Sequence, residues 1–223
     1  MADAKERWEL AQEHEAAWWA EYLETELGFT NHSQLAGFRL AEGRYWITRF
    51  DFPWHDWRFS REDSFFGGKK LLDLGCAVGS FFELATGLRK VVAIDPLLAT
   101  LAENIKAVTT RKQGTCTYKS CVIQDIQEED FDIVWCCNVL DHCAGWRDIL
   151  AHCARVLNPG GTLLLAVDCR YQGHQGDKFH ISPFTAAEVL AALDEAGFEV
   201  EWHSEINDEA VQYNFRVRAV KKE

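Results

Sequence analysis

Hydrophobic and polar positions follow different periods along the chain, and the change of period divides it into elements. From Lys5 to Leu27, apolar side chains recur at the 3.6-residue spacing of an amphipathic helix. From Gly28 to Gly68, the aromatic stretch GRYWITRFDFPWHDWRFS is too irregular for one element, and we interpret it as a covering segment. From Lys69 onward, strand-like and helix-like runs alternate to the end of the chain.

The alternating region predicts a sheet with helices between its strands. The strand-like runs are LLDL, KVVAID, CTYKSCVI, FDIVWCCN and GTLLLAVD. The helix-like runs are Gly79–Thr86, Leu97–Thr110, Trp146–Leu157 and a last helix that Thr185 caps and Gly197 ends. The final runs, FEVEWHSE and AVQYNFRVRAV, alternate at period two and predict a hairpin that turns at NDE.

Strands that alternate with helices favour an α/β fold. We expect a doubly wound, mostly parallel seven-stranded sheet with a C-terminal antiparallel hairpin, plus an N-terminal helical lid. Residues 1–64 form the helical and aromatic lid in this interpretation, and residues 65–223 form a Rossmann-like core. The tryptophans of the N-terminal helix could line a substrate pocket, although packing is the commoner role of such a stripe.

Composition and charge narrow the class of protein. The chain has 223 residues, 48% of them hydrophobic and 26% charged, as in folded globular domains. Its formal net charge of -12 argues against nucleic acid or an anionic membrane as partner, because both bind clustered Lys and Arg. The N-terminus is too charged for a signal peptide, and the eight cysteines form no CxxC pair. We therefore expect a cytoplasmic protein with reduced cysteines and a small-molecule partner.

The first strand ends in a glycine turn, KKLLDLGCAVGSF, that carries the main functional signal. Asp73 lies inside the buried run, and Gly75 and Gly79 follow it where a ligand can approach the backbone closely. The fit to the dinucleotide pattern G-x-G-x-x-G is poor. The pattern D-x-G-x-[GA]-x-G instead resembles motif I of the class I S-adenosylmethionine-dependent methyltransferases, with Ala77 where glycine is commoner. The resemblance extends over about Lys69 to Lys222.

Residues after the next strands complete the expected cofactor site. A carboxylate at Asp95, at the end of the second strand, suits a ribose diol. The resemblance implies that Asp125 and Ile126 meet the adenine, that Asp73 faces the methionine portion, and that FDIVWCCNVLDHC and LNPGG are the family's later motifs. Arg49 or Arg44 could bind the cofactor's carboxylate. The predicted cofactor-binding set is Asp73, Gly75, Ala77, Gly79, Asp95, Pro96, Asp125, Ile126, Asn138 and Arg49.

Candidate catalytic residues depend on the acceptor of the methyl group. A hydroxyl acceptor needs a base nearby, and histidine is the usual one. His142 follows the fourth strand and is the first candidate, although a histidine at the edge of the core is an equally good interpretation. His180, with His174, lies on the loop after the fifth strand and is the second. An amine or carboxylate acceptor needs little base assistance, and we expect no metal requirement.

The resemblance implies transfer of a methyl group from S-adenosylmethionine to an oxygen or nitrogen of a small molecule, such as a sugar or natural-product intermediate. Two alternatives stay open. One is a cofactor-binding partner subunit without transfer activity. The other is a nicotinamide-dependent oxidoreductase, which Ala77, Gly79 and the missing third glycine disfavour. The sequence leaves the oligomeric state open.

Overall fold

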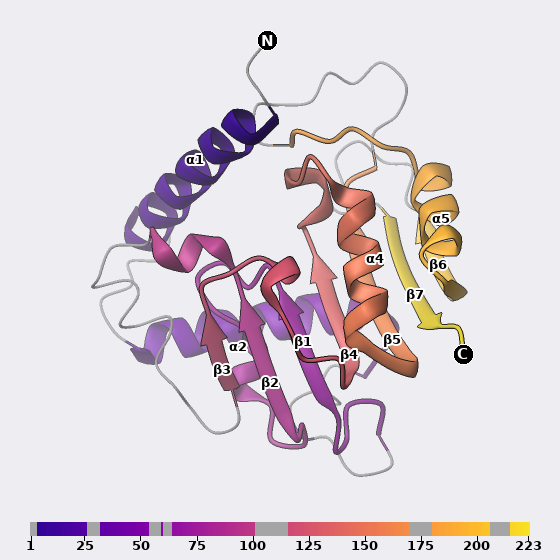
Figure 1. The fold of residues 1–223 in the computed structure, drawn as a ribbon. Helices are drawn as coiled ribbons and strands as arrows, with labels where there is room; N and C mark the ends of the chain where they lie inside the picture. The colour runs from indigo at the N-terminus through magenta and orange to yellow at the C-terminus, as the bar shows by residue number, and fades with distance from the viewer. Residues whose placement is uncertain are drawn as a thin grey trace. The chain divides into compact units, whose positions relative to one another are not determined.

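The computed structural model describes residues 4–25, 32–53, 59, 64–100, 116–169, 180–205 and 215–223. Its helices are α1 (Ala4–Thr25), α2 (His32–Arg49), α4 (Trp146–Val156) and α5 (Ala186–Glu195) (Figure 1). Its strands are β1 (Lys70–Leu74), β2 (Lys90–Ile94), β3 (Cys116–Lys119), β4 (Phe131–Cys137), β5 (Leu157–Val167), β6 (Phe198–Glu205) and β7 (Phe215–Lys221). Short 3-10 helices are η1 (Phe81–Leu84), η2 (Pro96–Ala99), η3 (Ile123–Asp125) and η4 (Leu140–His142).

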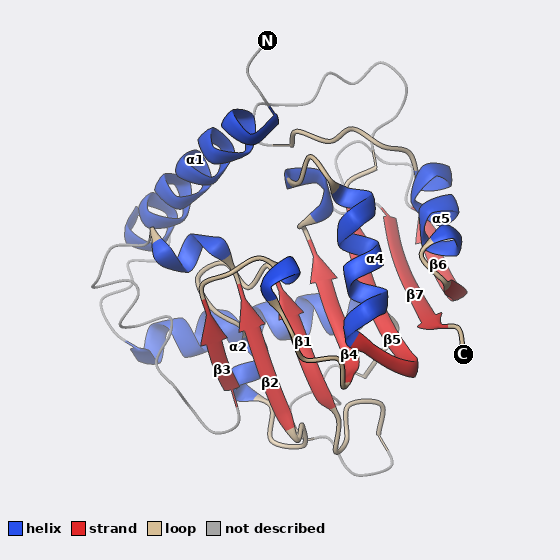
Figure 2. Cartoon of the chain, viewed as in Figure 1, coloured by secondary structure: helices blue, strands red, loops and turns tan. Residues whose placement is uncertain are grey.

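The seven strands form one mixed sheet in the order β3-β2-β1-β4-β5-β7-β6 (Figure 2). Its C-terminal strands β6 and β7 pair antiparallel, as the period-two alternation predicts. The expected fold class, a mostly parallel seven-stranded sheet with a C-terminal antiparallel hairpin, is therefore confirmed. The chain groups into two compact units, residues 13–122 and residues 123–223 with 1–12, and we describe each separately.

The unit of residues 13–122 holds three parallel strands. Leu72 pairs with Val92 in the register of β1 and β2, and Val92 pairs with Thr117 of β3. All five residues of β1 are buried, which is typical of a parallel strand covered on both faces. Because parallel strands end at the same edge, the residues that follow β1 and β2 come together there.

The unit of residues 123–223 holds β4 to β7. Strand β5 pairs parallel with β4 and antiparallel with β7. Thr185 caps α5 with a capping box: its side chain accepts from the Glu188 N–H, and the Glu188 side chain accepts from the Thr185 N–H. Gly197 has a φ of 86° just after the helix, where a left-handed residue closes the last turn. The predicted start and stop of this helix are both confirmed.

Helix α2 is the largest departure from the sequence interpretation. We interpret the stretch of residues 43–60 as too irregular for one element, and its first part, up to Arg49, belongs to the single helix His32–Arg49. Its buried positions do recur at helical spacing, but Arg39 and Gly43 occupy two of them. A hydrophobic pattern is broken at both positions, which explains why the periodicity was not apparent.

Smaller differences concern the ends of elements. The helix expected over Gly79–Thr86 is only the four-residue η1. The strand expected over CTYKSCVI ends at Lys119. Of the helix expected over Leu97–Thr110, the structure shows the η2 turn, and residues 101–115 lie outside the described part of the chain.

The division at residue 64 into lid and core stays a prediction. Within the unit of residues 13–122, Arg39 of α2 forms a buried ion pair with Glu83, so one interaction crosses the predicted boundary.

None of the helices in the described part of the chain is long and apolar enough to cross a bilayer.

Candidate functional site

The turn after β1 is held in a conformation that favours glycine. Gly75 has a φ of 77° and Gly79 a φ of 131°, both in a region that a side chain disfavours. Ala77 also has a positive φ, 45°. This conformation strains an alanine, at a position where the resembled family more often has glycine. The N–H groups of Gly75 and Cys76 both donate to the Ile94 carbonyl, at 2.9 and 3.2 Å. The turn is thereby fixed to the end of β2.

Asp95 joins this turn to the start of η2. Its Oδ2 accepts from the Ala77 N–H at 2.7 Å, and its Oδ1 accepts from the Leu97 N–H at 2.8 Å. Pro96 occupies the first position of η2, where no N–H is required. Burial raises the pKa of Asp95 to about 6, although these two hydrogen bonds lower it. Each carboxylate oxygen keeps a further lone pair, so Asp95 can still accept from ribose hydroxyls.

Two further carboxyl groups, those of Asp73 and Glu42, have raised pKa values. Burial raises the pKa of Asp73 to about 7, with a hydrogen bond from Ser80 lowering it and the Asp95 charge raising it. Burial also raises the pKa of Glu42, on α2, to about 7, and the charge of Asp73 adds to that effect. A cofactor with sulfonium and ammonium groups would favour the charged forms of both carboxyls, so the turn fits S-adenosylmethionine. Glu42 was not singled out from the sequence.

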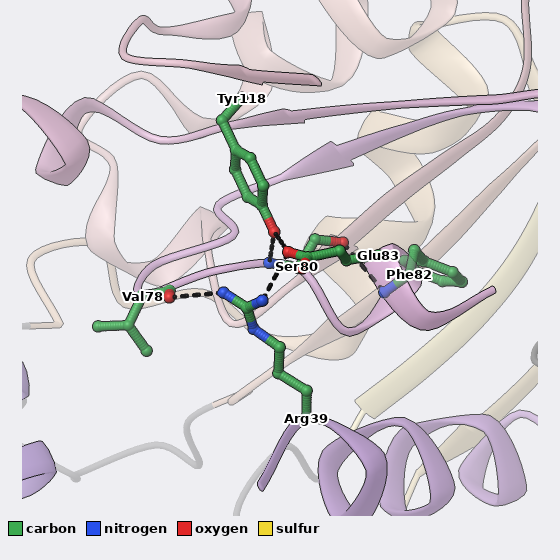
Figure 3. Close-up of polar contacts among 6 residues, drawn as sticks. All are labelled: Arg39, Val78, Ser80, Phe82, Glu83 and Tyr118. Atoms are coloured by element: carbon green, nitrogen blue, oxygen red, sulfur yellow. Dashed lines mark hydrogen bonds and ion pairs between the residues drawn. The ribbon is translucent and has the colours of Figure 1, made fainter. Parts of the chain in front are cut away.

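A buried network attaches α2 to the same turn (Figure 3). Arg39 donates through Nη1 to the Glu83 carboxylate at 2.5 Å and through Nη2 to the Val78 carbonyl at 3.2 Å. The Tyr118 hydroxyl donates to the same Glu83 oxygen at 2.5 Å and accepts from the Ser80 N–H at 3.2 Å. Side chains from α2, η1 and β3 therefore support the backbone of the glycine turn. Arg39 lies 44 residues before Glu83, so spacing gave no signal for this contact.

The predicted arginine contact has a different partner in the structure. Arg49 is the last residue of α2, and its guanidinium lies 3.3 Å from the centroid of the Tyr45 ring. Its Nη1 also donates to the Tyr45 carbonyl at 3.4 Å. Contact between Arg49 and the cofactor's carboxylate stays a prediction.

In the unit of residues 123–223, the two predicted adenine residues differ in exposure. Asp125 ends η3 with its side chain exposed, and Ile126 is 1% exposed. The Ile126 carbonyl accepts from Arg155 Nη2 at 2.6 Å, which fixes the backbone at this position. Asp125 is therefore available to a ligand, and Ile126 offers little free surface.

Asn138 begins the turn after β4. Its φ of 58° is left-handed, a conformation that asparagine tolerates better than most residues. Its N–H donates to the Ala166 carbonyl at 2.9 Å, and its side-chain Oδ1 lies 3.3 Å from His142 Nε2. The structure thus brings the predicted cofactor residue Asn138 and the predicted catalytic residue His142 into direct contact.

The two predicted catalytic histidines lie together. The rings of His142 and His180 have centroids 4.7 Å apart, and His180 Nε2 lies 3.5 Å from Oδ2 of Asp141, which is fully buried. Ser182 fixes the segment of His180, because its N–H donates to the Asp141 carbonyl at 3.0 Å and its hydroxyl to the Cys143 carbonyl at 2.6 Å. Sequence analysis did not single out Asp141. His174 lies outside the described residues.

Known methyltransferases are similar to this chain. The methyltransferase domain family matches residues 72–165. A Mycolicibacterium smegmatis protein named "Probable S-adenosylmethionine-dependent methyltransferase" is 28% identical over 80% of this chain and 68% of its own length. A ubiquinone biosynthesis O-methyltransferase of Pseudomonas aeruginosa is 29% identical over 61% of this chain, and the alignment spans only 62% of that enzyme.

Solved structures share the fold. The 1,6-didemethyltoxoflavin-N1-methyltransferase of Burkholderia thailandensis, solved with 1,6-didemethyltoxoflavin and S-adenosylhomocysteine, matches all of this chain and 92% of its own with a TM-score of 0.63 and 16% identity. The [4+2]-cyclase SpnF matches 71% of this chain and 76% of its own with a TM-score of 0.57 and 18% identity. Together with the glycine turn, Asp95 and the sheet order, these similarities support a class I S-adenosylmethionine-dependent methyltransferase, with S-adenosylmethionine as its cofactor.

Proposed function

We propose that this chain transfers the methyl group of S-adenosylmethionine to a hydroxyl oxygen of a small molecule. The observation that supports an oxygen acceptor is the convergence of Asp141, His142 and His180 just after β4. A carboxylate and two imidazoles can together orient a hydroxyl group, and an imidazole can accept its proton. The O-methyltransferase activity in the name of the Pseudomonas relative is consistent with this choice.

The chain's own residues would bind and orient the cofactor. Gly75 and Gly79 leave the backbone open to close approach, and Asp95 would accept from the ribose hydroxyls. The bound cofactor supplies an electrophilic methyl group on a sulfonium. In the proposed transfer, the acceptor oxygen would form the C–O bond as the C–S bond breaks with its electron pair on sulfur, and the hydroxyl proton would pass to a neighbouring imidazole or to water.

The acceptor is proposed to be small and the protein cytoplasmic. The net charge of -12 gives no general attraction to nucleic acid or anionic lipid, so neither is proposed as a partner. A nitrogen acceptor is the second candidate, since the Burkholderia neighbour is named an N1-methyltransferase. A third candidate is binding of the cofactor without transfer, because the same fold occurs in the cyclase SpnF.

The test uses S-adenosylmethionine carrying a ¹³C-labelled methyl group. The purified chain is incubated with this cofactor and a bacterial metabolite extract, and the products are examined by heteronuclear NMR, in which O-methyl and N-methyl carbons differ in chemical shift. We expect a labelled O-methyl product that is lost with His142→Ala or His180→Ala and retained with His203→Ala, a variant of an exposed histidine on β6.

Other outcomes select among the candidates. A labelled N-methyl product would replace the proposal with the nitrogen acceptor. If calorimetry shows cofactor binding but no labelled product forms in extracts from several sources, the chain binds the cofactor without transferring its methyl group, and the proposal is wrong.

A further inference from the structure

The group formed by Asp141, His142 and His180 has the composition of a metal site. Each residue offers one ligand atom, and these atoms all lie within 4.8 Å of one another. We propose that the group binds one divalent transition-metal ion of the zinc type. This inference rests on the cluster itself, which lies wholly within the unit of residues 123–223, and it departs from the sequence-based expectation that no metal is required.

The ligand types determine which ion fits. Two imidazoles and one carboxylate form a common set for zinc and related transition metals. Magnesium and calcium prefer sets made only of oxygen ligands. A divalent cation would also neutralise the carboxylate of Asp141, which is fully buried. The site is therefore expected to bind zinc or cobalt and to discriminate against magnesium.

The distances between the ligand atoms are close to those of a zinc site. Two ligand atoms bound to one tetrahedral zinc ion at 2.0–2.2 Å lie roughly 3.4 Å apart. His180 Nε2 and Asp141 Oδ2 are already 3.5 Å apart. All the ligand atoms lie within 4.8 Å of one another, and a rotation of a histidine ring can remove an excess of this size.

Groups around the cluster would orient the ligands. A histidine that binds a metal through one ring nitrogen commonly donates the other N–H to an oxygen. Asn138 Oδ1 lies 3.3 Å from His142 Nε2 and is such an acceptor. Ser182 holds the segment of His180 through its two hydrogen bonds to Asp141 and Cys143. The ligands thus come from two segments that the structure fixes to each other.

Three protein ligands leave a coordination position for an exchangeable group. Catalytic zinc sites have this arrangement, whereas structural sites use four protein ligands. Water would take this position, or a hydroxyl oxygen of the acceptor, whose proton a bound cation makes easier to lose. If the proposed function is correct, the ion would activate the acceptor. If it is wrong, the metal site stands independently.

The first test measures metal binding without any assay of activity. Tag-free full-length protein is treated with a chelator, exchanged into clean buffer and titrated with zinc chloride in a calorimeter. The eight free cysteines can also bind zinc, so the His142→Ala/His180→Ala double variant supplies the baseline. We expect one additional site per chain in the native protein. Each single variant should weaken that site at least tenfold, and His203→Ala should leave it unchanged.

Cobalt provides a second measurement that cysteine binding does not imitate. Cobalt bound by nitrogen and oxygen ligands gives visible absorption without the thiolate charge-transfer bands of a cysteine site. Circular dichroism of each variant checks that it is folded. Equal zinc stoichiometry in the native protein and the folded double variant would overturn the proposal. Thiolate bands as the only cobalt signal would also overturn it.

Asn138 gives a sharper comparison within the same turn. In Asn138→Gly, the new residue tolerates the left-handed φ of 58°, but the side-chain oxygen that faces His142 is removed. In Asn138→Asp, a side-chain oxygen is kept. Loss of an outer partner of a ligand typically weakens metal affinity 10–100-fold. We expect this loss for glycine and little change for aspartate. Equal zinc affinity in both variants would overturn the orienting role of Asn138.

Discussion

The turn after β1 and the turn after β4 both follow buried strands, but they are built differently. The first is made of backbone, with left-handed residues at Gly75 and Gly79 and turn amides bound by Asp95 only 18 residues after Ala77. The second is made of side chains, and its parts come from segments on either side of residues 170–179. A backbone site leaves a local pattern in the sequence. A side-chain site of this kind leaves only scattered residues.

Gly75→Val tests the backbone turn most severely. A β-branched side chain at a φ of 77° adds roughly 1–3 kcal/mol of strain and occupies the space that a ligand would approach. We expect calorimetry to detect no binding of S-adenosylmethionine, with the protein still folded. Gly37→Ala is the control, because a Cβ at this helical position meets nothing within 4 Å. Unchanged cofactor affinity in Gly75→Val would show that the motif assignment is wrong.

Arg39→Leu tests the buried support of the same turn. It leaves the Glu83 carboxylate without its cation in an environment where Arg39 is 2% exposed. Removing one partner of a buried pair costs about 3–5 kcal/mol of unfolding free energy. The exposed pair of Arg147 and Glu195, with N and O 3.3 Å apart, is the control. Arg147→Leu should cost no more than about 1 kcal/mol in urea denaturation. Equal losses of unfolding free energy in Arg39→Leu and Arg147→Leu would show that burial does not make the pair of Arg39 and Glu83 more important for stability.

Asp95→Asn tests a carboxylate that binds the turn amides and that we propose to bind the ribose. The carboxylate binds the Ala77 and Leu97 amides through different oxygens, and an amide has only one oxygen to offer. With the ribose contact weakened as well, cofactor affinity should fall by about 1.5–3 kcal/mol, or roughly 10- to 150-fold. Asp132→Asn, in the other unit, should leave the affinity unchanged. A loss below tenfold in Asp95→Asn would point to another acid as the ribose ligand.

Asp73 makes stability depend on pH. Its pKa is raised from 3.8 to about 7 in the folded protein, chiefly by burial, so the folded state binds more protons than the unfolded state between these values. The free energy of unfolding should therefore fall as pH rises from about 4 to 7, by at most about 1.4 kcal/mol per pH unit. Asp73→Asn should reduce this slope and melt higher than the native protein at pH 8. An unchanged slope in the variant would assign the dependence to other groups, such as Glu42.

Sequence reasoning was most successful where the signal is local. The turn of β1, the position of Asp95 and the caps of α5 are each read from a few neighbouring residues, and the structure has all of them. It failed for α2, where Arg39 occupies a buried position because a distant carboxylate compensates its charge. No pattern within one helix contains that information.

The same limit applies to the candidate site after β4. His142 and His180 were chosen as histidines near strand ends, and the structure brings them together. Asp141 was missed, although it is adjacent to His142, because an acid at the end of a strand is common and its partner His180 is distant in the sequence. Pairing of this kind depends on the contact between the segment of Ser182 and η4, which the backbone hydrogen bond of Ser182 to Asp141 fixes and composition does not reveal.

Ser182→Ala tests how the segment of His180 is held, and it should give the smallest loss of unfolding free energy among these variants. The variant removes the hydroxyl bond to the Cys143 carbonyl, 39 residues away, but keeps the backbone bond to Asp141. A single buried hydrogen bond contributes about 0.5–1.5 kcal/mol, so the free energy of unfolding should fall by this amount. Ser120→Ala is the control, because its bond to the Pro96 carbonyl is long, 3.5 Å, and exposed. Equal small losses of unfolding free energy in the two variants would mean that the Ser182 side chain does not help to hold the segment of His180. The turn after β4 would then depend on backbone hydrogen bonds, as the turn after β1 does.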